Sequence, residues 1–460
     1  MQPYTIHKIA EVTGGTLLQG NPATLVKGVC TDSRKAKAGD VFVALQGQQA
    51  DGHDFAVKAL EQGATALLVS QRVREVATEV PVVLVEDTLQ ALQLLASHNR
   101  ASLNIPVLAV TGSNGKTSTK DMIASVLNTR YNTLKTEGNY NNELGLPLTL
   151  LNLTADHQAA VVEMGMRGPG EIDFLARLAK PTGAVITNIG EAHLERLGSV
   201  ENIALAKTEV LEHIGAEGFA VLNADSPFLR ELSGRCKGKV WLYSLAGPAD
   251  IRGYNLRPDG NGVRYEILYP GGQGEIRLPV PGSHNVMNSM AAVGVGLQLG
   301  LQFDEIACGL EQVALTHMRL EILNVKGMTV INDTYNANPS SAKAALQVLQ
   351  ETATGRKIAV LGNMFELGEL EQSGHQEVGE AAAVLAVDYL VTVGNLAQWI
   401  ARGGVKGGLH PGRVRQCENN DQAVEFLKDI LQHGDTILVK GSRGMRMEEI
   451  VKELVKDNRE

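Results

Sequence analysis

One segment, AVTGSNGKTSTK at 109–120, most constrains what this chain can fold into. The apolar run IPVLAV (105–110) leads into its glycines, and a helical pattern over 117–130 follows them. A turn that joins a strand to a helix points backbone N–H groups at an anion, and the helix dipole adds to their attraction. The segment therefore predicts a phosphate-binding loop within an α/β fold.

The loop is shorter than the usual phosphate-loop pattern, in which a glycine stands five residues before the Gly of the Gly-Lys-Ser/Thr end. Here Val110 stands at that position. Lys116 can place a positive charge on the terminal phosphates of a nucleotide, and the Thr117 hydroxyl can bind Mg²⁺. The alternative is a glycine-rich turn whose lysine only faces solvent. The predicted phosphate-binding residues are Gly112, Ser113, Asn114, Gly115, Lys116, Thr117 and Ser118.

The chain is too long for one domain. At 460 residues it exceeds what a single hydrophobic core usually supports. Apolar runs alternate with helical stretches in three series, which predicts three α/β domains at 1–100, 101–318 and 319–460. We expect a small N-terminal domain, a central P-loop-like domain with a parallel sheet covered on both faces, and a C-terminal Rossmann-like domain. Alternating residues and turn signals over 240–282 predict antiparallel hairpins beside the central sheet.

Composition narrows the classes of partner. The formal net charge of −9 argues against a protein that coats nucleic acid or an anionic membrane, because those partners need a basic face. The four cysteines lie far apart without a Cys-x-x-Cys pair, so neither a disulfide framework nor a zinc site is supported. No stretch approaches the roughly 18 apolar residues that a membrane-spanning helix needs. We expect a soluble cytoplasmic protein without membrane insertion and without a nucleic-acid partner.

Polar residues follow two further apolar runs of the central series. Glu163 ends the run AAVVEMG (159–165), and His193 follows the run GAVITNIG (183–190). Since strand ends of a parallel sheet meet at one edge, Glu163 can hold Mg²⁺ beside the phosphates, and His193 can bind a metal or carry a proton. A helix-capping glutamate and a surface histidine are the alternatives. Lys207 is more simply interpreted as a solvent-facing helix lysine, because an ammonium group has only donors and cannot bind a metal.

Polar groups further along the chain can contact a nucleotide. Asn285 and Asn288 lie at the start of a predicted helix, where paired amides can bind a purine edge or simply cap the helix. Arg319 lies where the second and third domains meet, and its guanidinium can clamp phosphate across a closing cleft. The segment NDTYNANPSS (332–341) is unusually dense in polar turn residues for a routine connection, and a plain turn is its alternative.

These motifs resemble those of the Mur ligases, the ATP-dependent amide-forming enzymes of peptidoglycan synthesis. That family's loop, T-G-T/S-N-G-K-T, is short in the same way as this one. The resemblance spans nearly the whole chain. Its motifs are TDSRKAKAGDVFVALQG and DGHDF in the first domain, TGSNGKTS, EGNYNNELGLPLTLLNL, EMG, TNIGEAHLERLGS, AKTEV and GSHNVMNSMAA in the second, and NDTYNANPSS, LGNMFELGE and KGSRGMRMEEIV in the third.

The resemblance implies roles for the catalytic residues. Lys116 and Thr117 would bind the ATP phosphates and Mg²⁺, while Glu163 and His193 would bind magnesium, with two ions in all. Lys207 matches the family lysine that reacts with carbon dioxide, and the oxygens of the resulting carbamate can bind the second ion. The implied catalytic residues are Lys116, His193, Lys207 and Arg319.

The resemblance also implies roles for the binding residues. The nucleotide would be contacted by Asn285, Asn288, Arg319 and Asp333. The UDP end of the substrate would be held in the first domain by Ser33, Arg34, Asp51, Gly52 and His53. A substrate-side loop would contribute Asn139, Asn141 and Asn142. The third domain would supply a dipeptide site with Tyr335, Asn336 and Asn338.

Two segments narrow the expected reaction. DTYNANP and GNYNNELGLP resemble the branch that joins D-alanyl-D-alanine to UDP-N-acetylmuramoyl-tripeptide through an acyl phosphate. We also expect the protein to be a monomer. One departure is Asn363, where many relatives have Asp, which puts a charged role there in doubt.

Three other readings stay open. A sister Mur ligase would add the third peptide residue. A folylpolyglutamate synthase usually has Gly where this chain has Thr117, and it lacks a UDP-binding domain. A nucleotide-binding switch or kinase would use ATP without any need for D-alanyl-D-alanine.

Overall fold

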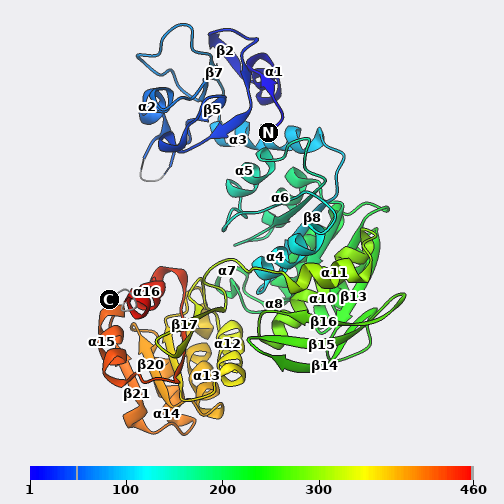
Figure 1. Cartoon of the computed structure of the whole chain (residues 1–460). Helices are drawn as coiled ribbons and strands as arrows, with labels where there is room; N and C mark the ends of the chain where they lie inside the picture. The colour runs from blue at the N-terminus through cyan, green and yellow to red at the C-terminus, as the bar shows by residue number, and fades with distance from the viewer. Residues whose placement is uncertain (48–49, 457–460) are drawn as a thin grey trace.

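The protein forms three α/β domains, each built on its own sheet (Figure 1). The computed structural model describes residues 1–47 and 50–456. Figure 1 shows the first domain above the central domain and the third domain at the lower left, beside the lower part of the central domain. Among the helices of the described residues, none is both long enough and apolar enough to cross a membrane.

The first domain contains a five-stranded sheet in the order β2-β7-β6-β5-β4, parallel except for β2. Its strands are β2 (Thr16–Gln19), β4 (Gly28–Cys30), β5 (Asp40–Val43), β6 (Ala66–Val69) and β7 (Val82–Leu84), and β1 (Tyr4–Thr5) pairs separately with β3 (Leu25–Val26). Its helices are α1 (Ile6–Thr13), α2 (Ala56–Glu61), α3 (Thr88–Ala101) and the 3-10 helices η1 (Ser33–Lys35) and η2 (Gly52–Phe55).

The central domain contains a nine-stranded sheet in the order β16-β15-β14-β13-β12-β11-β8-β10-β9. Its strands are β8 (Val107–Thr111), β9 (Thr133–Lys135), β10 (Ala159–Glu163), β11 (Gly183–Ile186), β12 (Phe219–Asn223), β13 (Lys239–Ser244), β14 (Ile251–Asp259), β15 (Gly262–Tyr269) and β16 (Gly272–Leu278). Its helices are α4 (Lys116–Leu127), α5 (Gly145–Leu151), α6 (Glu171–Ala179), α7 (Leu194–Leu197), α8 (Val200–Thr208), η3 (Glu209–His213), α9 (Pro227–Glu231), η4 (Leu232–Arg235), α10 (Ser283–Gln298) and α11 (Phe303–Glu311). The antiparallel β14, β15 and β16 extend this sheet, which confirms the hairpins predicted over 240–282.

The third domain contains a six-stranded sheet in the order β17-β18-β22-β19-β20-β21, parallel except for β17. Its strands are β17 (Glu321–Val325), β18 (Met328–Asp333), β19 (Lys357–Gly362), β20 (Tyr389–Val393), β21 (Val414–Cys417) and β22 (Thr436–Lys440). Its helices are α12 (Pro339–Thr352), η5 (Gly368–Leu370), α13 (Glu371–Val384), α14 (Gln398–Lys406), η6 (Pro411–Arg413), α15 (Asn420–Ile430), η7 (Arg443–Met445) and α16 (Glu448–Lys456).

Helices cover both faces of the central sheet, as the apolar strand runs predict. Every residue of β8 is buried, and its side chains alternate between two clusters. Val107 and Ala109 pack in one cluster with residues of α5 and α6, while Leu108 and Val110 pack in the other with residues of α4 and α10. Because β8 lies between β11 and β10, the strand order reverses at its carboxyl end, which is where ligands bind in such sheets.

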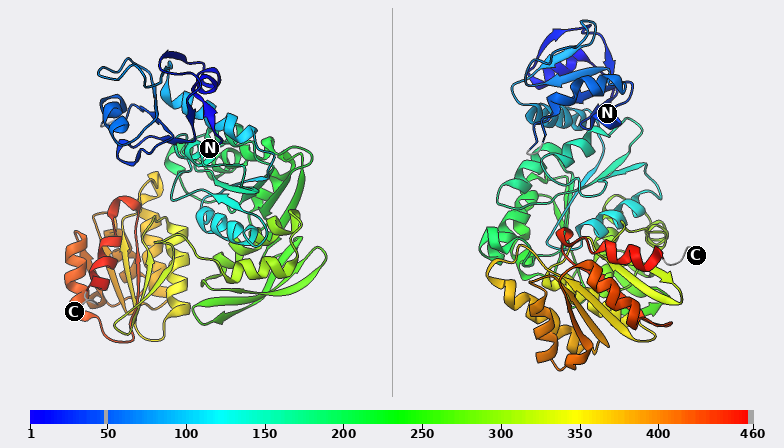
Figure 2. Two further views of the ribbon diagram at one scale, coloured as in Figure 1. Left: turned by 45° about the horizontal axis from the view of Figure 1, so that its top comes forward. Right: turned by 90° about the vertical axis from the view of Figure 1, so that its left-hand side faces the viewer.

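The first domain shares its core with the central domain, whereas the third does not. Leu92 and Leu95 of α3 belong to one apolar cluster with Ile9 of α1 and Leu146 of α5. The two clusters of the third domain contain no buried residue from the central domain among the described residues. Figure 2 shows the third domain against the central one as a separate layered body. The domain boundaries at 100 and 318 stay predictions, because α3 packs on both sides of the first.

Candidate active site

A cleft of about 890 Å³ lies between the central and third domains, at the carboxyl ends of their parallel strands. It gathers most of the predicted site residues. Those that line it are Ser113, Asn114, Gly115, Lys116, Thr117, Ser118, Asn139, Asn141, Asn142, Glu163, His193, Asn285, Asn288, Arg319, Asp333, Tyr335, Asn336 and Asn338. Residues far apart in sequence thus meet at one site.

The predicted phosphate loop joins β8 to α4, and its glycines are required by its shape. Gly115 immediately precedes α4 with φ 78°, and a Cβ there would lie 2.6 Å from Asn288 Oδ1. Gly112 has φ 145° and sits against Thr187. Only glycine reaches such backbone angles without a steric cost, and the close approach leaves no room for a side chain. The glycines therefore let the loop pack closely against Thr187 and Asn288. The N–H groups of Ser113 and Asn114 donate to Asn188 at 3.0 and 2.9 Å, and the N–H groups that open α4 follow them.

Lys116 is held within this loop. Its Nζ donates to the Gly112 carbonyl at 2.8 Å and to the Ser113 carbonyl at 3.3 Å. Burial lowers the pKa of Lys116, and the neighbouring Glu163 carboxylate opposes that effect. Since the only acceptors it contacts among the described residues are carbonyls, the ammonium is placed to turn to phosphate oxygens.

Thr117 and Glu163 form an oxygen-rich pair beside the loop. The Thr117 hydroxyl donates to Glu163 Oε2 at 2.8 Å, and Asn141 Nδ2 donates to Glu163 Oε1 at 2.7 Å. Glu163 is buried, and these two donors satisfy the hydrogen-bonding needs of its carboxylate. Hydroxyl and carboxylate oxygens suit Mg²⁺, which keeps several waters and takes few protein ligands. The described residues contain no cluster of three or more His, Cys, Asp or Glu side chains able to hold a metal.

Lys207 is not a solvent-facing helix lysine. Near the end of α8 it is buried, and its Nζ donates to the Gly112 carbonyl at 3.1 Å. Burial, together with the charge of Lys116, lowers the pKa of Lys207 well below its usual value. Its burial overturns the interpretation of Lys207 as a solvent-facing helix lysine.

His193 reaches the cleft from a strained backbone position. It has φ 67°, in the left-handed region, and its Nδ1 lies 2.9 Å from Glu366 Oε2 of the third domain. Burial and the nearby Lys207 and Lys116 lower the pKa of His193, which favours the neutral imidazole that binds metals. Its loop follows β11, as predicted.

Asn285 and Asn288, predicted to contact the nucleotide, hydrogen-bond to neighbouring groups of the protein. Asn285 Nδ2 donates to the Pro281 carbonyl at 2.8 Å, and Asn288 Nδ2 donates to Asn285 Oδ1 at 3.2 Å. The pair is therefore internally bonded on α10, beside the phosphate loop. A role at the purine edge stays a prediction.

Arg319 occupies the junction between the two domains. Its guanidinium carbon lies 4.1 Å from the ring centre of Tyr335, and its buried Nε has no hydrogen-bond partner among the described residues. The neighbouring Met318 and Leu320 have φ 64° and 50°, angles that cost a non-glycine residue about 1 to 2 kcal/mol each. The strained junction thus holds an arginine that lines the cleft and whose buried Nε is unpaired among the described residues.

Sequence reasoning missed Lys440, which ends β22 next to the end of β18. Its Nζ lies 2.5 Å from Asp333 Oδ2 and 2.8 Å from the Asn336 carbonyl. The signal was present, since Lys440 follows an apolar strand run in DTILVKGSRG. Asp333, predicted to contact nucleotide, is thus paired with a lysine at the base of the cleft.

The third domain touches the phosphate loop directly. Asn338 caps the start of α12, and its Nδ2 donates to Asn114 Oδ1 at 2.8 Å. Asn114 Nδ2 in turn donates to Ser340 Oγ at 2.8 Å. Asn338, predicted for the dipeptide site, therefore contacts the loop that would hold the phosphates, and its dipeptide role stays a prediction.

Asn363, which departs from the family pattern, hydrogen-bonds to the segment that leads into α14. Its Oδ1 accepts from the backbone N–H groups of Leu396 and Ala397 at 3.0 and 2.9 Å, and its Nδ2 donates to Asn395 Oδ1. The uncharged amide thus accepts hydrogen bonds from the two N–H groups just before α14. No charge at this position is needed to form the loop.

The predicted UDP residues lie outside the cleft, in the first domain. Asp51, just before η2, has its Oδ1 2.5 Å from His53 Nδ1, and His53 Nε2 accepts from the Ser70 N–H at 3.0 Å. Arg34 pairs with Asp32 at 2.9 Å. The predicted residues here are Ser33, Arg34, Asp51, Gly52 and His53, on the two 3-10 helices η1 and η2 and the residue before η2. Their role in UDP binding stays a prediction.

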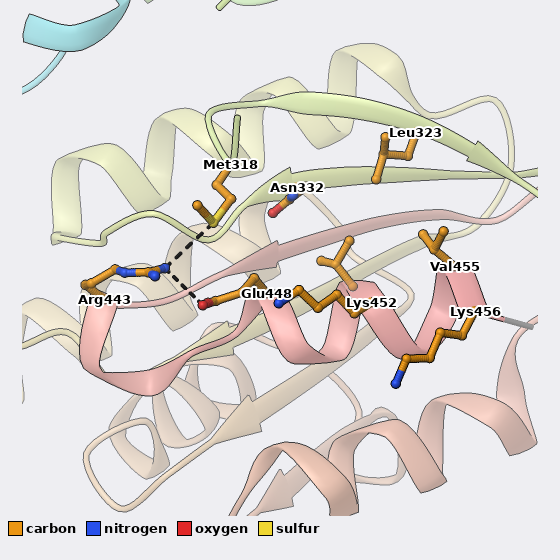
Figure 3. Close-up of a pocket in the computed structure, with 9 residues that line it drawn as sticks. Met318, Leu323, Asn332, Arg443, Glu448, Lys452, Val455 and Lys456 are labelled. Carbon is orange, nitrogen blue, oxygen red and sulfur yellow. Dashed lines mark hydrogen bonds and ion pairs between the residues drawn. The ribbon is translucent and has the colours of Figure 1, made fainter. Parts of the chain in front are cut away.

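A second hollow of about 570 Å³ lies on the third domain between β17 and α16 (Figure 3). Arg443 there donates to Glu448 at 3.0 Å and approaches the Met318 sulfur at 3.7 Å. It contains no predicted site residue, so the interdomain cleft is the candidate active site.

Comparison with known proteins identifies the family. The model described as Mur ligase family, catalytic domain matches residues 25–100, the Mur ligase middle domain matches 110–296, and the Mur ligase, glutamate ligase domain matches 318–443. The chain is 41% identical over 456 residues to the UDP-N-acetylmuramoyl-tripeptide–D-alanyl-D-alanine ligase of Bacillus subtilis, covering 98% of each chain.

Solved structures agree with that match. The fold is similar to MurF from Acinetobacter baumannii, with a TM-score of 0.90, 34% identity and 99% of each chain covered. It is also similar to MurF ligase from Thermotoga maritima in complex with ADP, with a TM-score of 0.83, 29% identity and coverage of 94% and 98%. This chain belongs to the Mur ligase family.

Proposed function

We propose that the chain is an ATP-dependent ligase that joins D-alanyl-D-alanine to UDP-N-acetylmuramoyl-tripeptide in peptidoglycan precursor synthesis. The observation that carries the proposal is the match, over 98% of both chains, to a relative named for this reaction. The Thermotoga relative that binds ADP supports the use of ATP. The cleft supports the proposal, because the predicted phosphate loop lines it on one side and the third domain lines it on the other.

The chemistry follows from a carboxylate being a poor electrophile in water. A carboxylate oxygen of the tripeptide attacks the terminal phosphorus of ATP, which forms an acyl phosphate and releases ADP. The amine of D-alanyl-D-alanine attacks the acyl carbon, loses a proton and displaces phosphate. Two anions must first meet, so Lys116, Arg319 and the loop N–H groups act chiefly by offsetting repulsion and aligning the reactants.

Thr117, Glu163 and His193 are the residues that would hold magnesium. Their hydroxyl, carboxylate and neutral imidazole groups fit that ion or a second one beside it. When bound, Mg²⁺ neutralises negative charge on the phosphate oxygens.

Lys207 would complete the site as a carbamate. Its buried amine has a lowered pKa, and a neutral amine is the form that bonds to the carbon of carbon dioxide and then loses a proton. The product exchanges a cation for an oxygen-bearing anion, which removes the chemical objection to lysine near a metal. A cytoplasmic monomer stays a prediction.

Phosphate release tests the proposed function. ATP and Mg²⁺ are supplied with the UDP-tripeptide and D-alanyl-D-alanine, separately and together. We expect release only when both substrates are present, and loss of release in Lys116→Ala. Release that ignores the dipeptide would contradict the proposal and favour a nucleotide switch or kinase. Release that needs a free amino acid and a shorter precursor would point to a sister ligase.

A further inference from the structure

The contact between His193 and Glu366 joins the central domain to the third domain at the predicted metal site. The two atoms, Nδ1 and Oε2, are 2.9 Å apart. Glu366 is half exposed, and ion pairs of that kind add at most about 1 kcal/mol to stability. Stability alone is therefore a weak reason for the contact.

Both residues adopt backbone angles that non-glycine residues avoid. His193 has φ 67° and Glu366 has φ 63°. Such angles cost about 1 to 3 kcal/mol each and persist where the surrounding structure imposes them, commonly at functional sites. Two strained residues from different domains that point their side chains at each other indicate a built arrangement.

Close backbone packing accompanies the pair. The segment around α7 meets η5, where Gly368 has φ 55°. A Cβ on Gly368 would lie 3.0 Å from the Glu195 Cβ, a tight contact, and its positive φ favours glycine. The third domain is thus seated against the His193 loop by its main chain as well as by Glu366.

The chemistry of imidazole gives the contact a consequence. A neutral histidine donates from one ring nitrogen and offers a lone pair on the other. If Nδ1–H donates to the Glu366 carboxylate, Nε2 carries the lone pair, and carboxylates commonly orient metal-binding histidines in this way. We propose that Glu366 is a positioning residue, supplied by the third domain, that orients His193 and fixes its Nε2 as the metal-binding atom.

The domain that supplies Glu366 makes the metal site responsive to closure. Because the pair forms only when the two domains are seated together, a metal ion bound by Nε2 stabilises the seated arrangement, and seating strengthens metal binding by the same factor. The contacts of Asn114 with Asn338 and Ser340 seat the same domain on the phosphate loop. The inference rests on the proposed function, in which a divalent cation accompanies the nucleotide.

Metal binding in the full-length chain tests the inference. Mn²⁺ serves as the probe, and its affinity in the presence of ADP is measured by electron paramagnetic resonance. We expect Glu366→Ala to weaken Mn²⁺ binding by about 10- to 100-fold. Glu366→Gln, which keeps an acceptor oxygen, should bind Mn²⁺ more tightly than Glu366→Ala does. Glu369→Gln, which changes an exposed carboxylate three residues along the chain in η5, is the matched control and should bind like the unmodified chain.

Two further readouts separate positioning from a general loss of structure. ADP affinity measured with a chelator and no metal should be unchanged in Glu366→Ala. The decrease in radius of gyration on adding Mn²⁺ and ADP, measured by small-angle scattering, should be smaller than in the unmodified chain. Equal Mn²⁺ affinity in Glu366→Ala and the unmodified chain would overturn the inference alone, whereas an unmodified chain that binds no Mn²⁺ with ADP would overturn the proposed function as well.

Discussion

Lys207 is the residue whose meaning changed most between sequence and structure. In the sequence it is one lysine of a predicted helix, and its ammonium form cannot bind a metal. In the fold it is buried with its Nζ on the Gly112 carbonyl, and burial lowers its pKa. Gly112 stands 95 positions earlier in the chain and contacts Lys207 only in the fold. This tertiary environment, and not the local sequence, gives Lys207 its chemistry.

Removing the Lys207 amine should remove activity that a free carboxylate can partly restore. We expect Lys207→Ala to lower the rate of phosphate release by about 100-fold or more, the scale of losing one electrostatic contact to the reacting groups. Short-chain carboxylic acids should recover part of the rate, because they return the oxygens of the carbamate. Lys428→Ala, on an exposed helix position, is the control. Full activity of Lys207→Ala without supplement would remove the carbamate from the mechanism.

At the scale of elements, α4 is fixed by a buried charge network that its sequence pattern does not reveal. Asp121 Oδ1 accepts from Lys135 at 2.7 Å and lies 3.2 Å from Lys120, while its Oδ2 accepts from the Thr316 N–H and hydroxyl at 2.9 and 2.7 Å. Burial would raise the pKa of Asp121, but Lys120 and Lys135 bring it below its usual value. The helix that opens at the phosphate loop is thereby tied to the segment that enters the domain junction.

Breaking this network should destabilise the protein strongly. Asp121→Asn leaves the Lys120 ammonium buried without its counter-charge, which typically costs about 3 to 5 kcal/mol. The free energy of unfolding in urea measures the loss. Glu305→Gln is the control, because it removes the charge of a partly exposed pair with Arg130 and should cost less than about 1 kcal/mol. Equal losses in the two variants would show that burial of the network does not matter.

At the scale of the whole molecule, the domains are joined in two different ways. The first and central domains share an apolar core through α3, whereas the third meets the central domain through a polar cleft. Apolar cores resist sliding because they are close-packed, while a polar cleft exchanges its contacts with water and ligand. Movement of the third domain against the other two is the expected motion.

The cleft should also make stability sensitive to acid. Burial lowers the pKa of His284 on α10 to about 4, although Asp333 across the cleft opposes the shift. The unfolded chain, with a histidine pKa near 6.5, then binds more protons between about pH 6.5 and 4, so stability falls as the pH falls through that range. By pH 5 the loss is about 2 kcal/mol.

Urea unfolding at pH 7 and pH 5 checks this expectation. His284→Gln cannot take up the proton and should lose about 2 kcal/mol less than the unmodified chain between the two pH values. His7→Gln, at an exposed position of α1, should behave like the unmodified chain. An unchanged pH dependence in His284→Gln would contradict the assignment.

The local features of this protein were determined by sequence alone. Strand, glycine turn and helix around Lys116 follow from apolar periodicity and the backbone freedom of Gly115, which are properties of neighbouring residues. The hairpins over 240–282 follow from alternation and turn residues in the same way. The family resemblance came from such local motifs, and the comparisons confirmed it.

Only the tertiary structure decided which of these residues act together. It placed Lys440 on Asp333, bonded Asn338 to Asn114 of the phosphate loop and brought Glu366 to His193. These pairs come from strand ends and loops of separate domains, and no local pattern records their distance. Pairing, burial and the resulting pKa shifts depend on how the sheets are placed against each other, because they are set by the free energy of the whole packed chain and not by neighbouring residues.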